Sequence, residues 1–356
     1  MVGTDSLARG MEGGAGKLLH GDKTAIFIAE KNNPWFNLAT EAWLIEQSDL
    51  QDKHILYLWR NQPCIVIGRY QNPWVECNLP AMERDGILLA RRQSGGGAVY
   101  HDLGNTNFTF ISPKERYDKQ RNFDILLDAL AACGLNAELS GRNDVLCQGR
   151  KCSGNAFQVT STRGCHHGTL LIDADLSRIG EYLTPDKRKL EAKGIRSVAS
   201  RVMNLREIEP SFSHERFSEA IISAFRKEYG EDAPIQGLDA SLLEQEPNLM
   251  ETYRRLSSDA WRFGTTPRFS HACDERLSWG RLTVHMDVVN GTITQVKVFS
   301  DALSTEGIEI LESMLPGLPY TSKAVLSEAG RRAASLGPDL AQMLLEGAQA
   351  LASELQ

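Results

Sequence analysis

The sequence predicts an α+β fold, with a mixed, largely antiparallel sheet and covering helices. Strand-like and helix-like patterns do not alternate regularly along the chain, which argues against a doubly wound parallel sheet. Two strand-like runs flank three consecutive glycines at residues 95–97, and no helix pattern follows directly. Alternating apolar residues later stand on both sides of Asn290-Gly291, which is typical of a β-hairpin. A chain of 356 residues suits one large domain and a smaller one.

Prolines, glycines and apolar runs define the expected elements of the first half. Asn33 and Pro34 are typical of a helix start, so we expect a helix over 34–46. Asn72-Pro73 predicts a second helix to about residue 84, and a third is expected over 123–133, ending at Gly134. The expected strands are 24–29, 55–59, 64–68, 87–90, 136–139, 144–147, 151–158 and 169–173.

The second half is expected to begin with helices and to end in a separate unit. Phe217, Ile221 and Phe225 recur at a spacing of four, which predicts a helix over 213–229. A second unit is expected from about residue 268. Its expected elements are hairpin strands at 281–289 and 292–299 and helices at 302–314 and 338–355.

Composition narrows the class of protein. Hydrophobic residues make up 42%, as in ordinary globular chains, and the net charge of −7 argues against a general nucleic-acid binder. The seven cysteines are scattered without a C-x-x-C motif, so we expect reduced thiols and neither a disulfide framework nor a structural zinc site. No apolar run is long enough to cross a membrane. We therefore expect a cytoplasmic protein without nucleic-acid or membrane partners, and a monomer is favoured.

The glycine run at 95–97 is a candidate anion site. Glycine permits positive φ and close backbone approach, and successive N–H groups can surround an anion. Arg91 and Arg92 precede the run, and arginine suits forked contacts with phosphate or carboxylate. The run lacks the following Gly-Lys-Ser/Thr of a P-loop and the following helix of a dinucleotide-binding turn. The alternative is an ordinary glycine-rich hairpin turn.

The stretch Arg91-Arg-Gln-Ser-Gly-Gly-Gly-Ala-Val-Tyr-His-Asp-Leu-Gly-Asn-Thr-Asn107 resembles the signature of the lipoate–protein ligases. The similarity runs from about residue 35 to about residue 302, and more weakly to the end. Further motifs of that family follow in order: Gly141-Arg-Asn-Asp144, Arg150-Lys-Cys-Ser-Gly-Asn-Ala156, His166-His-Gly-Thr-Leu170, Leu183-Thr-Pro-Asp-Lys187 and Lys193-Gly-Ile195.

The resemblance implies the biotin/lipoate-ligase fold, related to the class II tRNA-synthetase core, with a small α/β C-terminal domain. We expect a catalytic domain over 23–264 and an accessory domain over 268–356; glycine-rich residues 1–22 are interpreted as a flexible leader. The implied reaction joins lipoate to ATP as lipoyl-AMP and then transfers the lipoyl group to a lysine. The implied acceptors are lipoyl domains of 2-oxoacid dehydrogenase E2 subunits and the glycine cleavage H protein, with ATP, Mg²⁺ and lipoate as cofactors and substrate.

Residue roles are carried over from the same motifs. Lys151 is the expected catalytic cation, because an ammonium can bridge a carboxylate and a phosphate. Asp144 is expected to hold Mg²⁺ or the ribose, with an Asx turn as the alternative. His101 and His167 are expected to line the lipoyl pocket. The expected nucleotide contacts are Arg92, Gly95, Gly96, Gly97, Ala98, Val99 and Tyr100, with Lys187 and Lys193 in a lid over the adenylate, or in a solvated charged segment.

Other functions remain open at this point. An octanoyl- or lipoyltransferase of the same fold would need a cysteine nucleophile and no ATP. Asp186 stands where one branch of transferases has its cysteine, but Cys147, Cys152 and Cys165 lie near the site in sequence. A biotin ligase is disfavoured because its Gly-Arg-Gly-Arg-type loop is missing. A non-catalytic scaffold for lipoylated proteins would not need an ATP site.

Overall fold

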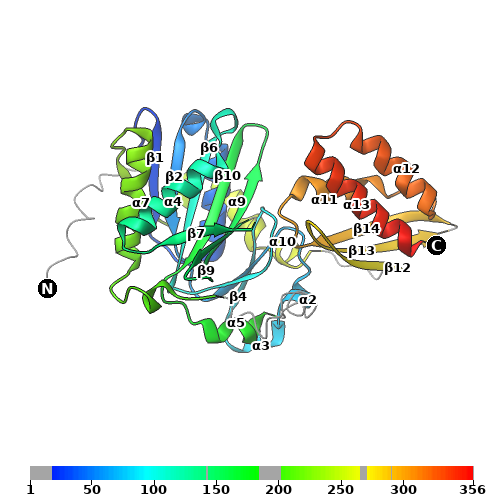
Figure 1. Cartoon of the computed structure of the whole chain (residues 1–356), viewed down its shortest axis with the longest axis horizontal. Helices are drawn as coiled ribbons and strands as arrows, with labels where there is room; N and C mark the ends of the chain where they lie inside the picture. Colours follow the sequence, from blue (N-terminus) through cyan, green and yellow to red (C-terminus); the bar gives the residue numbers. More distant parts are fainter. Residues whose placement is uncertain (1–17, 142, 184–201, 265–270, 290, 356) are drawn as a thin grey trace. The chain divides into compact units, whose positions relative to one another are not determined.

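The structure of the protein is a computed structural model, which describes residues 18–141, 143–183, 202–264, 271–289 and 291–355 (Figure 1). The chain forms two compact units. The large unit comprises Met1–Val66, Cys77–Ala90 and Val99–Ser258, and the small unit comprises Ile67–Glu76, Arg91–Ala98 and Asp259–Gln356. Two short segments from the first half of the chain thus belong with its C-terminal part, which the sequence did not predict. The domain limits expected from the sequence stay predictions.

The centre of the large unit is an eight-stranded sheet. β1 pairs in parallel with β2 and β11, whereas the neighbouring pairs from β2 to β7 whose register is described are antiparallel. The mixed, largely antiparallel sheet expected from the sequence is confirmed. Across the sheet the strands are β11 (Ile235–Leu238), β1 (Thr24–Ala29), β2 (His54–Trp59), β6 (Asn105–Pro113), β10 (Arg163–Leu171), β9 (Arg150–Val159), β8 (Asp144–Cys147) and β7 (Ala137–Ser140).

Two helices of the large unit begin at capping residues. The side chain of Asn33 accepts hydrogen bonds from two backbone N–H groups of α1 (Pro34–Glu46), so this helix has the predicted limits. Asp118 caps α4 (Lys119–Ala132) in the same way. The predicted start at residue 123 was therefore late, because it was placed at the first apolar residue rather than at the cap.

The core of the large unit lies between the sheet and helices α4 and α7 (His214–Tyr229), which lie side by side (Figure 1). Phe217 and Phe225 of α7 contact the rings of Phe108 and Phe110 in β6, with ring centroids 6.4 and 6.2 Å apart. The spacing of four that predicted α7 is thus the spacing of its buried face.

The single helix predicted over 72–84 was wrong. The structure has two short helices there, α2 (Pro73–Glu76) and α3 (Leu79–Arg84). Cys77 leaves the helical path to form an isolated β-bridge, and the side chain of Asn78 caps α3. Each of the two helices has a proline in its first turn, Pro73 in α2 and Pro80 in α3, so the two prolines indicated two helices.

Strand β10 was predicted too short. The prediction over 169–173 missed its first part, which begins at Arg163. Residues 163–168 are all buried, so polar and apolar side chains do not alternate along them. Without alternation, this part of the strand has no period-two signal.

The glycine run is not a hairpin turn. It connects β4 (Leu88–Arg91) to β5 (Val99–His101), and these two strands lie on either side of β3 (Cys64–Ile67) in a three-stranded sheet. β5 pairs with β3 in antiparallel fashion, and not with β4. The alternative of an ordinary hairpin turn is therefore wrong.

The C-terminal part of the small unit is a three-stranded antiparallel sheet with three helices on one face (Figure 1). The predicted hairpin is confirmed, since β13 (Gly280–Val289) pairs with β14 (Thr292–Ser300). Two elements of this part were not predicted from the sequence: β12 (His271–Leu277) and α12 (Ser322–Ala333). The remaining helices are α11 (Thr305–Met314) and α13 (Pro338–Glu354).

The other helices are short, apart from α9. They are α5 (Ile179–Tyr182), α8 (Leu242–Gln245), α9 (Pro247–Ser257) and α10 (Asp259–Arg262), with 3₁₀ turns at Ser48–Leu50, Lys114–Arg116, Leu176–Arg178 and Leu205–Glu207.

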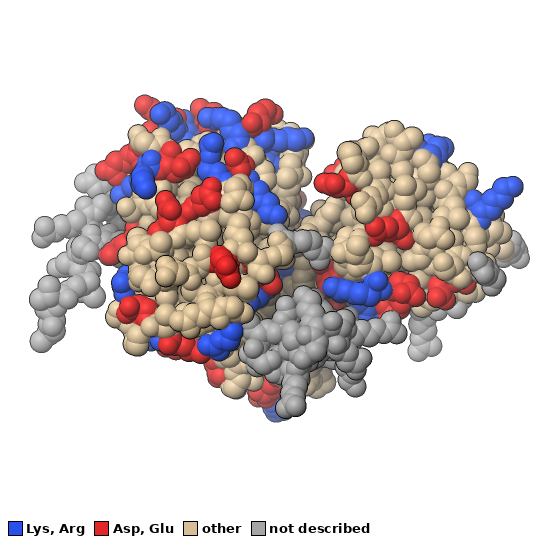
Figure 2. All heavy atoms as spheres, in the orientation of Figure 1, with Lys and Arg blue, Asp and Glu red and all other residues tan. Residues whose placement is uncertain are grey.

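No helix among the described residues has the length and apolarity needed to cross a membrane. On the face drawn in Figure 2, basic and acidic side chains of the large unit are interspersed.

Candidate active site

Lys151 and Asp144 face each other across a β-hairpin of the large unit. The Nζ atom of Lys151 lies 2.6 Å from Oδ1 of Asp144, and their side chains are 30% and 24% exposed. β8 and β9 are joined by Gln148 and Gly149, both with positive φ, which suits a two-residue hairpin turn. A short turn and strand pairing thus hold a cation beside a carboxylate.

Two further features hold Lys151 in place. Its carbonyl oxygen accepts a hydrogen bond from the backbone N–H of Met203 at 2.9 Å. A Cβ atom on Gly154 would lie 3.0 Å from Nζ of Lys151, tighter than ordinary contact, so the glycine leaves room for the lysine side chain. The sequence motif contained Gly154, but the reason for a glycine there became visible only in the structure.

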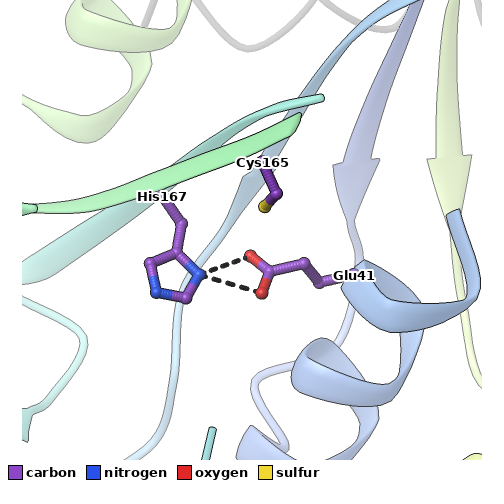
Figure 3. Close-up of side chains that lie close together, drawn as sticks. All are labelled: Glu41, Cys165 and His167. Carbon is purple, nitrogen blue, oxygen red and sulfur yellow. Dashed lines mark hydrogen bonds and ion pairs between the residues drawn. The ribbon is translucent and has the colours of Figure 1, made fainter. Parts of the chain in front are cut away.

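His167 belongs to a buried chain of hydrogen bonds that starts at Trp59. The indole N–H of Trp59 donates to Oγ1 of Thr109 at 3.0 Å, and Thr109 donates to Oε2 of Glu41 at 2.7 Å. Nδ1 of His167 lies 2.9 Å from both carboxylate oxygens of Glu41 (Figure 3). Cys165 lies on the same side of β10 as His167, and its sulfur lies near the same carboxylate.

His101 lies close to the same tryptophan. Its Nδ1 is 3.1 Å from Nδ2 of Asn61, and its ring makes an edge contact with Trp59 at 6.4 Å between centroids. The structure therefore links both histidines to Trp59. His101 is linked by a ring contact, and His167 is linked indirectly by hydrogen bonds through Glu41 and Thr109. The role of both in binding the lipoyl group stays a prediction.

The neighbouring His166 faces the opposite side of the sheet. Its Nε2 lies 2.9 Å from Oδ1 of Asn155, and its ring packs on Phe123 and Phe157 with centroids 4.8 and 4.7 Å away. Burial holds the pKa of His166 well below its usual value, with a further contribution from His167. The two adjacent histidines therefore point to opposite faces of the sheet, as successive residues of a strand do.

Arg92 binds the glycine loop from within the small unit. Its guanidinium donates to the carbonyl oxygen of Gly95 at 3.1 and 2.8 Å and to that of Gly97 at 2.8 Å. Gly96 has a φ of 97° and donates its N–H to the carbonyl of Ala302 at 2.8 Å. In this structure Arg92 and Gly96 are thus engaged with protein groups, and their contacts with nucleotide stay predictions.

Close packing explains why position 95 is a glycine. A Cβ atom there would lie 2.1 Å from the carbonyl oxygen of Ala302 and 2.7 Å from that of Leu303. Any side chain would therefore push the loop off the segment before α11. A Cβ on Gly97, in contrast, would meet no atom within 4 Å.

The remaining predicted residues are placed as follows. Val99 and Tyr100 lie in β5 of the large unit, and burial, with a smaller effect of Asp102, raises the pKa of Tyr100 to about 12. Ala98 is half-buried and ends the glycine loop. Lys187 and Lys193 lie outside the described residues.

Sequence reasoning missed Trp59, Thr109 and Glu41. Glu41 carried a usable signal, because it is an acidic residue within the otherwise apolar run of α1 and is only 7% exposed. A buried carboxylate needs hydrogen-bond donors, so it indicates a polar cluster. Its partners had no such signal, because threonine and tryptophan are ordinary strand residues.

Two of the three cysteines near the site, Cys152 and Cys165, are poor nucleophiles. Cys147, Cys152 and Cys165 are all buried. A hydrogen bond with Cys147, together with burial, raises the pKa of Cys152, and burial and the charge of Glu41 raise the pKa of Cys165 well above its usual value. A thiol nucleophile acts as the thiolate, so Cys152 and Cys165 are disfavoured as the nucleophile of a transferase. A hydrogen bond with Cys152 lowers the pKa of Cys147, and only its burial argues against this residue.

Comparison with known proteins shows which family the sequence belongs to. Residues 33–226 match the lipoyl protein ligase A/B catalytic domain, and residues 266–330 match the bacterial lipoate protein ligase C-terminus. A lipoate-protein ligase A of Psychrobacter cryohalolentis is 46% identical over 342 residues, which cover 94% of this chain and 99% of the relative.

Solved structures agree with that comparison. P. falciparum LipL1 in complex with lipoate has a TM-score of 0.80 and 32% identity, covering 90% of this chain and 99% of its own. A bipartite lipoate protein ligase of Thermoplasma acidophilum, solved in a study that includes its E2 lipoyl domain, has a TM-score of 0.61 and 25% identity, covering 70% and 99%. A lipoate-protein ligase A bound with ATP, at 24% identity and a TM-score of 0.59, supports the fold alone.

Proposed function

We infer that this chain, which belongs to the lipoate–protein ligase family, activates lipoate with ATP and transfers the lipoyl group to a lysine of an acceptor domain. In the first step a lipoate carboxylate oxygen attacks the α-phosphorus of ATP. An oxygen–phosphorus bond forms, the bond from the α-phosphorus to the bridging oxygen breaks, and pyrophosphate leaves. In the second step the lysine amine attacks the acyl carbon, loses a proton, and AMP leaves.

The observation that carries this proposal is the Lys151–Asp144 pair on a rigid hairpin. Two anions must approach each other in the first step, and negative charge grows on the α-phosphate. A fixed ammonium reduces that repulsion and stabilises the developing charge more than the ground state. We propose that Lys151 contacts the lipoate carboxylate and the α-phosphate, while Asp144 orients its ammonium group.

Asp144 also suits a Mg²⁺ ion. Mg²⁺ prefers oxygen ligands and is usually held by one or two carboxylates together with substrate phosphates and water. Oδ1 of Asp144 binds Lys151, and the partly exposed carboxylate has a second oxygen for the ion. When bound, the ion would neutralise phosphate charge.

The residues around Trp59 suit the lipoyl group. The large indole offers apolar contact to the aliphatic chain and ring of lipoate. The ring of His101 contacts it, and His167 is linked to it through Glu41 and Thr109. We propose that these two histidines line the lipoyl pocket. We further propose that Arg92, Gly95, Gly96, Gly97, Ala98, Val99 and Tyr100 contact the nucleotide, and that Gly96 exchanges its bond to Ala302 for one to phosphate.

The proposed acceptors are lipoyl domains of 2-oxoacid dehydrogenase E2 subunits and the glycine cleavage H protein, in the cytoplasm. The test incubates the chain with ATP, Mg²⁺, lipoate and one acceptor domain, and the acceptor is weighed by mass spectrometry. The expected result is a lipoyl mass increase that requires ATP and free lipoate, with release of pyrophosphate. Modification from an octanoyl-carrier donor without ATP would favour the transferase instead.

A further inference from the structure

We propose that Glu41, Cys165 and His167 form a three-ligand site for a borderline-soft divalent cation such as Zn²⁺, and that a cation bound there blocks the lipoyl pocket. The three candidate ligand atoms all lie within 4.8 Å of one another. Figure 3 shows the carboxylate of Glu41 pointing at the His167 ring, with the Cys165 sulfur beside it. This site is separate from Asp144, where the proposed cation is Mg²⁺.

The fold brings the three donors together from two elements. Cys165 and His167 are alternate residues of β10, so their side chains leave the strand on the same face. Glu41 comes from the buried face of α1. One thiol, one imidazole and one carboxylate are donors that Zn²⁺ accepts, and three protein ligands leave a fourth position for water or another ligand.

Charge balance favours a divalent ion in this buried place. The thiolate of Cys165 and the carboxylate of Glu41 would together carry two negative charges, which offset the two positive charges of the ion. A neutral set of charges costs far less to bury than an isolated ion. Glu41 and Cys165 are 7% and 3% exposed, and His167 is 9% exposed.

A second layer of hydrogen bonds already orients the carboxylate. Thr109 donates to Oε2 of Glu41 at 2.7 Å and is itself bonded to Trp59. Such outer contacts orient metal ligands and commonly change metal affinity on the order of tenfold to a hundredfold. The proposed site therefore has three ligands, and Thr109 orients one of them, Glu41.

Binding of the cation requires two proton changes. The Cys165 thiol loses its proton to solvent as the sulfur–metal bond forms. The hydrogen bond between Nδ1 of His167 and Glu41 is replaced by a metal bond from each residue, and the neutral ring carries its proton on Nε2. No oxidant or reductant takes part. Without the cation, the Glu41–His167 hydrogen bond satisfies both groups, so the pocket is complete in either state.

The consequence for activity rests on the proposed function. His167 cannot serve the lipoyl pocket while it binds a cation, and the cation would also bind Glu41, which is linked to Trp59 through Thr109. Zn²⁺ should therefore raise the KM for lipoate and leave kcat unchanged, since lipoate and Zn²⁺ compete. The active form of the enzyme is then the one free of Zn²⁺.

Binding is tested with Co²⁺ as a spectroscopic substitute for Zn²⁺ on the full chain. The expected result is about one Co²⁺ per chain, with the intense visible bands of a tetrahedral ion and the thiolate-to-metal absorption that only a sulfur ligand produces. Cys165→Ala should lose the thiolate absorption. Cys273→Ala is the matched control, because Cys273 is also buried but belongs to the small unit, and it should keep the absorption.

Thr109→Val provides a second variant that keeps all three ligands and nearly the same shape. It should weaken Co²⁺ binding on the order of tenfold or more. Circular dichroism checks that each variant is folded. Absence of thiolate absorption in the unaltered chain, or equal absorption in folded Cys165→Ala, would overturn the site.

Activity provides a separate readout. With Mg²⁺, ATP and an acceptor domain present, Zn²⁺ should inhibit ligation by the unaltered chain, excess lipoate should relieve it, and Cys165→Ala should ligate without sensitivity to Zn²⁺. Inhibition that lipoate does not relieve would contradict the competition. A chain that binds Co²⁺ through Cys165 but does not ligate lipoate would refute the proposed function and leave the metal site standing.

Discussion

The β8–β9 hairpin and the glycine loop carry the two strongest motifs of this chain, and they are held in different ways. Lys151 and Asp144 are positioned by a two-residue turn and by pairing between neighbouring strands. Gly95 and Gly96 are positioned by contacts with Ala302, which lies far along the chain. The hairpin brings the two side chains together by local pairing, with one added backbone bond from Met203, whereas the loop depends on tertiary packing within the small unit. Substitutions in the hairpin should therefore mainly change activity, whereas substitutions in the glycine loop should also change stability.

The largest effect is expected from Lys151→Ala. Loss of the ammonium should reduce lipoyl-AMP formation by at least about thirtyfold, because a charge-assisted contact contributes roughly 2 kcal/mol and more in the transition state. The free energy of unfolding should change little, since the side chain is 30% exposed. Pyrophosphate release measures the rate of lipoyl-AMP formation, and thermal unfolding measures the change in stability.

Arg150→Ala is the matched control for that prediction. Arg150 is the neighbouring cation and binds Glu207 on the surface, so its loss should leave adenylate formation close to normal. If both variants lost activity equally, the hairpin would contribute general positive charge rather than a positioned ammonium. Near-normal activity of a folded Lys151→Ala protein would remove Lys151 from the mechanism.

Gly96→Val should abolish ATP use while most of the structure remains. Its φ of 97° suits glycine and not a β-branched residue, and a Cβ would lie 2.8 Å from the Arg92 guanidinium. Equilibrium binding of ATP, measured by calorimetry, checks this. ATP affinity equal to that of the unaltered chain would show that the glycine serves only the path of the backbone.

Gly95→Ala and Gly97→Ala separate packing from backbone freedom within the same loop. The added methyl at position 95 meets the Ala302 carbonyl, so we expect a loss of about 1–3 kcal/mol in unfolding free energy. At position 97 the methyl meets no atom, so the loss should be below about 1 kcal/mol. Denaturant unfolding of the two variants compares them directly, and equal losses would contradict tight packing of the loop against Ala302.

Acid should act on the large unit through two histidines, the buried His54 and the half-buried His214. Burial lowers the pKa of His54 and of His214 from 6.5 to about 4. Because these folded pKa values lie below the unfolded value, the stabilisation is complete above pH 6.5 and is lost as the pH falls toward 4. We expect a loss of about 3 kcal/mol per histidine over this interval, because each unit of pKa shift corresponds to about 1.4 kcal/mol.

The pH dependence is tested with His54→Gln. His54 bonds to Ser112 at 2.8 Å and stacks on Tyr229, and it does not take part in the proposed chemistry. The variant should show a shallower fall of unfolding free energy between pH 6.5 and 4 than the unaltered chain. An identical slope in both proteins would mean that other groups cause the acid sensitivity.

Much of the fold could be predicted because its signals are local. Asn33-Pro34 predicted α1, the spacing of Phe217 and Phe225 predicted α7, and the alternation beside Gly291 predicted the β13–β14 hairpin. In each case residues within one or two turns decide the backbone conformation. The failures had nonlocal causes: the first part of β10 is buried without alternation, and the predicted helix over 72–84 is interrupted where Cys77 bridges to another segment.

By itself, the sequence determined the family, the order of most elements and the identity of Lys151 and Asp144 as a cation and a carboxylate on two successive strands. Only the tertiary structure decided which distant residues meet. It placed Glu41 against His167 and Cys165, and Ala302 against Gly95 and Gly96. The physical reason is that neighbouring residues fix local backbone angles, whereas contacts between distant segments depend on how whole elements pack to bury their apolar surfaces.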